Sequence, residues 1–154
     1  MHEVSKYFTI IALFLCFACR NNTPPNRINF SKEAEVVIYT AEKELTFDVE
    51  IAAVPAKRIQ GLMFRYSMEP NQGMFFIFDH MDLQTFWMKN TYLSLDMIFI
   101  DADYNIVQIH ENAFPLKEDP ITSDVPAMYV FEVLGGTTKK EGIEVGNRVE
   151  LRIE

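Results

Sequence analysis

The sequence predicts a mainly β (α+β) fold, with one small sandwich-like or barrel-like domain that includes one or two short helices. About eight short runs rich in β-branched and aromatic residues follow one another, separated by turn-forming residues. Only residues 55–66 repeat their apolar side chains with a helical period. The 154-residue chain is 49% apolar and 23% charged, which is enough for one domain with its own core. Together these features favour packed β-sheets.

The first 33 residues are expected to precede this domain. Residues 7–18 form an unbroken apolar run, too short to cross a bilayer as a helix but typical in length of a secretion signal. We therefore predict a signal peptide of the lipoprotein type at 1–18, a flexible tether at 19–33 and the mainly β domain at 34–154. The tether prediction rests on the polar, proline-containing composition that follows the apolar run.

The lipoprotein prediction depends on Cys19. A small residue, Ala18, precedes it at the end of the apolar run, as in signals where the cysteine thiol is acylated and becomes the first residue. Arg20 follows it, rather than an aspartate, which favours the outer membrane facing the periplasm. The expected location is therefore the cell envelope, outside the cytoplasm and lipid-anchored. An ordinary signal peptide cleaved nearby is the alternative.

The first half of the domain is predicted to contain a hairpin, a helix and a central strand. Residues 36–40 and 45–51 are strand-like and flank a polar turn, and Glu50 falls on the face of the second strand that should contact water. Pro55 suits the first turn of a helix over 55–66. Residues 74–78 are apolar on both faces, which indicates a central strand.

The second half is predicted to add further strands and one helical turn. Residues 83–90 alternate, and residues 95–101 and 106–110 should form a second hairpin. Residues 111–125 contain two prolines and no clear period, which predicts a loop. The remaining expected elements are a strand at 127–134, one helical turn at 137–141 and a last strand at 148–153.

Two carboxylates interrupt strand faces that are otherwise apolar, namely Asp96 and Glu132. A buried charge without a partner is too costly to persist, so each should have a cationic partner or a raised pKa. We therefore predict a polar cluster of Arg65, Lys89, Asp96 and Glu132 at one end of the β-scaffold. A structural network that fixes strand register is the simpler interpretation of the same residues.

Trp87 and Asn90 are expected at the rim of this cluster, so the predicted ligand-binding cleft is lined by Arg65, Trp87, Lys89, Asn90, Asp96 and Glu132. Three functions remain open. The first is a lipid-anchored binding or accessory domain for a small polar or carbohydrate ligand. The second is a hydrolase of envelope carbohydrate that uses Asp96 and Glu132 as acid and base. The third is a structural envelope protein without a ligand.

Composition argues against several other classes of function. The net charge of −8 disfavours nucleic-acid binding. Both cysteines, Cys16 and Cys19, precede the domain, and only His80 and His110 remain within it, so neither a metal site nor a cofactor is predicted. The methionines could suit Cu(I), but several lie in phenylalanine-rich strands, where methionine usually fills gaps in a core.

Several motifs resemble those of the uncharacterised prokaryotic family DUF 192. They are the sequences GLMFR at 61–65, GMFF at 73–76, WMKNT at 87–91 and the Leu95-Asp96 pair, followed by glycines at 135, 136, 142 and 146. The resemblance covers about residues 44–153. Asn147 departs from the acidic residue of the family pattern, and Asp103-Tyr104-Asn105 replaces a turn with glycine. The resemblance implies a compact mainly β fold, often behind a secretion or lipoprotein signal, and implies no activity.

Overall fold

The computed structural model describes residues 28–153, so the predicted signal peptide and residues 19–27 of the predicted tether lie outside the described residues. The strands are β1 (Ala34–Tyr39), β2 (Glu44–Ala52), β3 (Gln72–Asp82), β4 (Thr85–Phe86), β5 (Leu95–Ile100), β6 (Ile106–Ala113), β7 (Ile121–Thr122), β8 (Ala127–Leu134) and β9 (Arg148–Ile153). The helices are α1 (Pro55–Gln60) and α2 (Thr137–Glu141). None of the described helices is long and apolar enough to cross a membrane.

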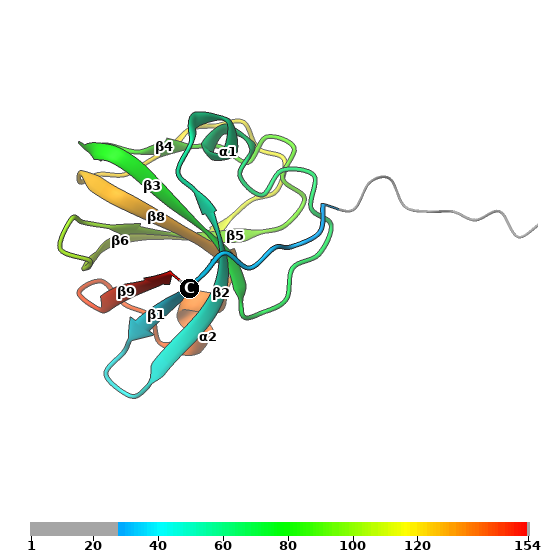
Figure 1. The fold of residues 1–154 in the computed structure, drawn as a ribbon. Helices are drawn as coiled ribbons and strands as arrows, with labels where there is room; N and C mark the ends of the chain where they lie inside the picture. Colours follow the sequence, from blue (N-terminus) through cyan, green and yellow to red (C-terminus); the bar gives the residue numbers. More distant parts are fainter. Residues whose placement is uncertain (1–27, 154) are drawn as a thin grey trace, which may run out of the picture.

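Seven strands form one curled sheet, a half-barrel, in the order β6-β5-β8-β3-β2-β1-β9 (Figure 1). All neighbouring strands are antiparallel except β2 and β3, which are parallel. The predicted mainly β fold is confirmed, and so are the two hairpins, which are β1–β2 and β5–β6. The strand predicted to be central, β3, lies in the middle of the sheet.

The two faces of the sheet carry separate apolar clusters, because successive side chains of a strand point to opposite faces. One cluster includes Phe47, Phe75 and Phe131, and α2 lies on this side, with Ile143 just beyond it packed into the cluster. The other includes Phe76 and Phe99. It is covered by α1 with the adjoining Leu62 and by the small β4–β7 sheet, whose Phe86 and Ile121 pack against it.

Gly73 permits the close packing of β3 against β8 in the centre of the sheet. A Cβ atom at this position would lie 2.5 Å from the carbonyl oxygen of Glu132 and 2.5 Å from the ring of Phe131. Both distances are shorter than any real contact, and one of the atoms belongs to the backbone. Only glycine therefore fits at position 73 while β3 stays paired with β8.

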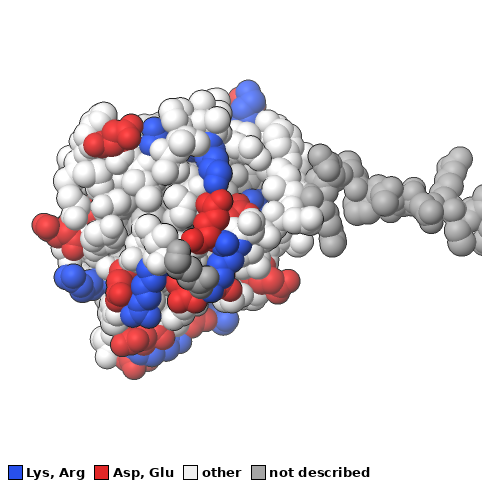
Figure 2. Space-filling view, in the orientation of Figure 1, with Lys and Arg blue, Asp and Glu red and all other residues white. Residues whose placement is uncertain are grey.

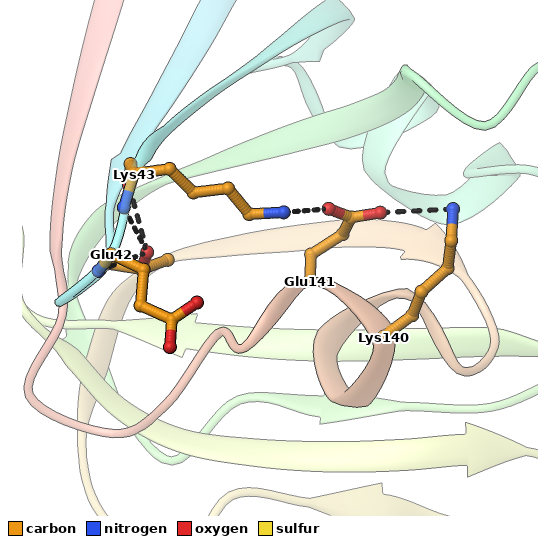
Figure 3. Close-up of polar contacts among 5 residues, drawn as sticks. Glu42, Lys43, Lys140 and Glu141 are labelled. Carbon is orange, nitrogen blue, oxygen red and sulfur yellow. Dashed lines mark hydrogen bonds and ion pairs between the residues drawn. The ribbon is translucent and has the colours of Figure 1, made fainter.

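Ion pairs hold α2 beside the turn between β1 and β2, as Figure 3 shows. Glu141 accepts from Lys43 at 2.6 Å and from Lys140 at 3.0 Å. The turn itself is closed by the Thr40 hydroxyl, which accepts from the backbone N–H groups of Glu42 and Lys43. These contacts are exposed, so they orient the short helix more than they stabilise it.

Several predicted elements differ in extent from the observed ones; for example, the strand predicted at 74–78 runs over Gln72–Asp82 and the strand predicted at 106–110 reaches Ala113. The helix predicted to reach residue 66 ends at Gln60, because Gly61 adopts a φ of +49° and its N–H caps the carbonyl of Lys57. In the stretch 83–90, only Thr85 and Phe86 pair as a strand. Their partners, Ile121 and Thr122, lie in the region 111–125 that was predicted to be loop throughout.

Candidate functional site

Two glutamates and two methionines form one row across four neighbouring strands. Glu50 of β2 pairs with Met74 of β3, Met74 pairs with Glu132 of β8, and Glu132 pairs with Met97 of β5. Residues directly opposite each other share a face of the sheet, so all four side chains point to the face covered by α1 and β4. Two strand spacings separate the backbones of Glu50 and Glu132, about 10 Å.

Glu132 is the unusual member of this row. The residue is 4% exposed, and among the described residues its carboxyl group has no hydrogen bond and no ion pair, so burial is the only influence on its pKa. Removal from water without a compensating charge disfavours the carboxylate, and this burial raises the pKa of Glu132 to about 8. The carboxyl group is therefore mostly protonated at pH 7 and can both donate and accept a hydrogen bond.

A pocket of about 270 Å³ opens above Glu132, between α1, β3 and β4. Its apolar wall consists of Ile59, Leu62, Met63, Phe76, Phe78, Phe86 and Trp87. Its polar groups are Arg58, Gln60, Thr85, Thr91 and Glu132. Gly61 lies close above the acid, since an added Cβ would come within 3.9 Å of Glu132 Oε2 and 3.5 Å of the Phe76 ring.

Arg58 lies at the α1 side of the pocket with most of its guanidinium engaged. It donates to the carbonyl oxygens of Ala53 at 2.9 Å and Ile77 at 2.7 Å, and it lies over the ring of Phe78. These bonds fix the side chain as part of the wall. Arg58 and Phe86 line the pocket but were not among the six predicted site residues. They come from α1 and β4, where the sequence pattern indicates a helix and a strand but not which residues meet at one pocket.

Trp87 forms the outer wall of the pocket and is 45% exposed. Lys89 lies over its ring with Nζ 5.3 Å from the ring centroid, and also approaches Glu118 at 3.5 Å. Lys89 is therefore at the edge of the pocket and does not approach either Asp96 or Glu132. Asn90 has a φ of +55° and uses its carbonyl oxygen to accept the N–H of Phe64 at 2.8 Å, so it shapes the loop behind Trp87.

Arg65 pairs with Glu50, and the prediction that it joins Asp96 and Glu132 is wrong. The guanidinium and the carboxylate are both buried and form a direct ion pair. The backbone N–H of Ser31 also donates to Glu50, at 2.7 Å. Glu50 was expected to contact water from the alternation of its strand. The chain segments around Ser31 and Arg65 cover it instead, and neither is visible in that alternation.

Asp96 is likewise not part of the pocket. It pairs with Val133, the residue next to Glu132, so the two carboxyl groups point to opposite faces of the sheet. Asp96 is fully buried and accepts four hydrogen bonds, from the backbone N–H groups of Asn112, Gly136 and Thr138 and from the Thr138 hydroxyl, at 2.7 to 2.9 Å. These bonds satisfy the carboxylate without a cation, which is why the predicted partnership with Lys89 is absent.

The four residues of the expected cluster therefore lie apart: Arg65 pairs with Glu50, Asp96 binds the start of α2, and Lys89 lies outside the pocket that Glu132 lines. Of the six predicted site residues, only Trp87 and Glu132 line the same pocket. Within residues 28–153, no group of three or more His, Cys, Asp or Glu side chains is arranged to hold a metal ion. The fold and site thus define a small mainly β domain that keeps a protonated glutamate at the floor of an aromatic pocket.

The chain belongs to the DUF192 family, whose model, described as "Uncharacterized ACR, COG1430", matches residues 36–151. This confirms the resemblance seen in the sequence. A solved structure from Sinorhizobium meliloti 1021, named a "putative transcription regulator", is similar at 43% identity and a TM-score of 0.76, over 80% of this chain and 97% of that one. A protein of unknown function from Novosphingobium aromaticivorans DSM 12444 is 35% identical with a TM-score of 0.74, over 75% and 83% of the respective chains. No curated protein matches.

Proposed function

We propose that the protein is a lipid-anchored binding domain outside the cytoplasm, and that its pocket takes a small uncharged carbohydrate. The carrying observation is Glu132, a buried carboxyl group without a protein partner at the floor of a pocket whose outer wall is a half-exposed tryptophan. No described residue bonds to this carboxyl group, and it faces the pocket, so a ligand that fills the pocket and displaces solvent has to provide its hydrogen bond.

The chemistry of the pocket favours a hydroxyl-bearing ligand. A protonated carboxyl group offers one donor and one acceptor, and a sugar hydroxyl offers the same pair in return. Trp87 and Phe86 provide flat apolar surfaces on which a sugar ring can stack. A cationic ligand would favour the ionised form of Glu132, so its binding would strengthen as the carboxyl group loses its proton.

The lipid anchor and the location outside the cytoplasm rest on the sequence alone, on the apolar run 7–18 and Cys19. The hydrolase alternative with Asp96 and Glu132 as acid and base is not proposed further, because the two side chains lie on opposite faces of the sheet. The name given to the Sinorhizobium protein does not extend to this chain, whose net charge of −8 disfavours binding to nucleic acid.

The test uses Trp87, the only tryptophan in the chain, as its reporter. The purified mature protein, with its native N-terminus and in detergent, is titrated with glucose, galactose and N-acetylglucosamine, and with cationic glucosamine for comparison. We expect at least one uncharged sugar to shift the Trp87 emission saturably. Glu132→Gln should keep the affinity within about threefold, whereas Glu132→Ala should lose about tenfold or more, because an unmet buried hydrogen bond costs about 1–3 kcal/mol.

Glu144→Gln provides the matched control, since Glu144 is exposed in the loop before β9 and should leave binding unchanged. Tight binding of glucosamine that Glu132→Gln abolishes would show a cationic ligand and contradict the proposal. A wild-type protein that responds to none of these sugars would contradict it as well.

A further inference from the structure

Four large apolar side chains gather at one end of the domain without being buried. They are Phe64, Tyr66, Tyr92 and Leu116, each between 40% and 55% exposed. They come from three loops, at 61–71, 87–94 and 114–120. The rings of Tyr66 and Tyr92 stack with centroids 4.7 Å apart. The N–H of Phe64 bonds to Asn90 and that of Leu116 bonds to Thr91, so the three loops form one continuous surface, here termed the loop surface.

The backbone holds two of these side chains in a conformation that bulky residues rarely adopt. Phe64 has a φ of +64° and Leu116 a φ of +61°. Such residues cost free energy and persist only where the surrounding structure fixes them, which here is done by the hydrogen bonds between the loops. The exposure of Phe64 and Leu116 is therefore built into the loops and does not result from loose packing.

The described chain begins beside this surface. Ile28 and Phe30 are half-buried and line the same depression as Phe64 and Tyr66. In Figure 1 the start of the described chain and the loop that follows α1 lie on the same side of the domain. Eight residues, 20–27, lie between Cys19 and Ile28, so nine Cα-to-Cα steps connect the two. Nine steps span at most about 30 Å when extended, and about 17 Å on average for a flexible chain of this length.

The charge of the loop surface differs from that of the rest of the protein. The three loops contain three cationic residues (Arg65, Lys89, Lys117) and three anionic ones (Glu69, Glu118, Asp119), so their net charge is zero in a chain of net charge −8. In the view of Figure 2, the red and blue residues concentrate over the lower part, near β1, β2 and β9, and the side where the described chain begins is mostly white. The loop surface therefore carries no net charge that an anionic lipid surface would repel.

We infer that the loop surface rests on the bilayer in which the acylated Cys19 is anchored, with Phe64, Tyr66, Tyr92 and Leu116 in contact with the lipid interface. The inference rests on the lipid anchor of the proposed function and is independent of the carbohydrate ligand. Tyrosine is suited to this position, since its ring contacts the acyl region while its hydroxyl remains in the headgroup layer. The short connection to Cys19 keeps the surface within reach of the membrane. The pocket beside Trp87 then opens near the membrane, because Trp87 and Thr91 belong to the same loop as Tyr92.

The test measures quenching of a single tryptophan by brominated lipid. Acylated mature protein with Trp87→Phe and Leu116→Trp is reconstituted into vesicles of phosphatidylethanolamine and brominated phosphatidylcholine. We expect its emission to fall about twofold or more relative to vesicles without bromine, as for a side chain within the interface. Val145→Trp in the same Trp87→Phe background is the control, because Val145 is equally exposed but lies in the loop between α2 and β9, and it should not be quenched.

Flotation of the same vesicles distinguishes attachment through the lipid anchor from docking of the loop surface. Protein that floats and carries the acyl group, but whose Leu116→Trp reporter is quenched no more than the Val145→Trp reporter, overturns docking and leaves the anchor intact. Protein without an acyl group that stays at the bottom of the gradient overturns both. Sedimentation in detergent tests a second copy of the chain as the occupant, and dimers that Leu116→Asp converts to monomers would overturn docking on lipid.

Discussion

Glu50 and Glu132 show how two buried carboxyl groups in one cross-strand row are tolerated in different ways. Arg65 reaches Glu50 from the loop after α1, and the resulting ion pair keeps the charge. Glu132 lies two strands away and has no cationic partner among the described residues, so burial raises its pKa to about 8 and the proton neutralises it. In the cross-strand row, Met74 therefore lies between an ion-paired carboxylate, Glu50, and a neutral hydrogen-bonding group, Glu132.

The raised pKa of Glu132 predicts a dependence of stability on pH. In the unfolded chain its carboxyl group ionises near 4.5, whereas in the folded protein it keeps its proton up to about pH 8. The folded state therefore binds more protons between these values, and stability falls as pH rises through this window and levels off above it. Relative to Glu132→Gln, the wild-type free energy of unfolding should decrease by up to about 5 kcal/mol.

Urea denaturation of both proteins at about pH 5 and about pH 9 measures most of this difference, about 4 kcal/mol. The subtraction removes the contribution of the groups that both proteins share. Glu150, whose pKa is lowered to about 2 by its hydrogen bonds with Arg152 and Tyr39, alters stability only at lower pH than this range. Parallel changes in the two proteins would mean that Glu132 is already ionised in the folded state near neutral pH.

Part of the site could be predicted at the level of single residues. The interruption of apolar strand faces by Asp96 and Glu132 identified both as unusual, and both are buried. Their partners could not be predicted. Alternation along a strand shows which residues share a face of the sheet, but it does not show which other segment of the chain covers that face. The same limit applies to Glu50. Its strand alternates like one with a face in water, but the segments that contain Ser31 and Arg65 cover that face.

At the level of elements, Asp96 joins three segments that are distant in sequence. Its carboxylate, in β5, accepts hydrogen bonds from the backbone N–H groups of Asn112 in β6 and of Gly136 and Thr138 at the beginning of α2. A helix of five residues has too few internal hydrogen bonds to be stable alone, so α2 depends on this carboxylate for its position. The simpler interpretation offered by the sequence, a network that fixes structure, describes Asp96 correctly.

Asp96→Ala should destabilise the protein by about 3–5 kcal/mol, because three N–H groups and one hydroxyl lose their acceptor inside the protein. Chemical denaturation gives this value, and binding at the pocket should be retained wherever the variant is folded. Asp103→Ala is the matched control in an exposed turn and should change stability by about 0.5 kcal/mol or less. A loss of ligand binding in folded Asp96→Ala would show that Asp96 also acts on the pocket.

The accuracy of the predicted elements followed the strength of their local signals. The hairpins β1–β2 and β5–β6 were predictable because each strand alternates and each turn is polar. The helix was predicted too long because Ile59, Leu62 and Met63 continue a helical period past Gly61, although only Leu62 is buried. β4 lies inside the stretch 83–90 that was predicted from its alternation, but only two of its residues pair, and β7 has two residues, which is too short for a period to be recognised.

At the scale of the whole molecule, the curled sheet separates a structural side from a side suited to binding. The face beneath α2 is closed by an apolar cluster and by the bonds of Asp96. The opposite face carries the glutamate row, the pocket and the loops beside which the described chain begins. Strands β2 and β3 are parallel, so a long crossover segment has to connect them. This segment covers the face that carries the pocket, and it contains α1, Gly61 and Arg65.

The orientation of the whole molecule depends on which cysteine is acylated, and the chain contains a matched control for that question. Cys19 follows Ala18 at the end of the apolar run, whereas Cys16 lies within it. We expect cells labelled with radioactive palmitate to incorporate label into the wild type and Cys16→Ser, and to lose it with Cys19→Ser, because acylation and cleavage require the cysteine after the small residue. Label that survives in Cys19→Ser and is lost in Cys16→Ser would move the anchor three residues towards the N-terminus. A wild type without label would mean that the apolar run is an ordinary signal peptide, and the protein would then lack the attachment that holds its loop surface close to the bilayer.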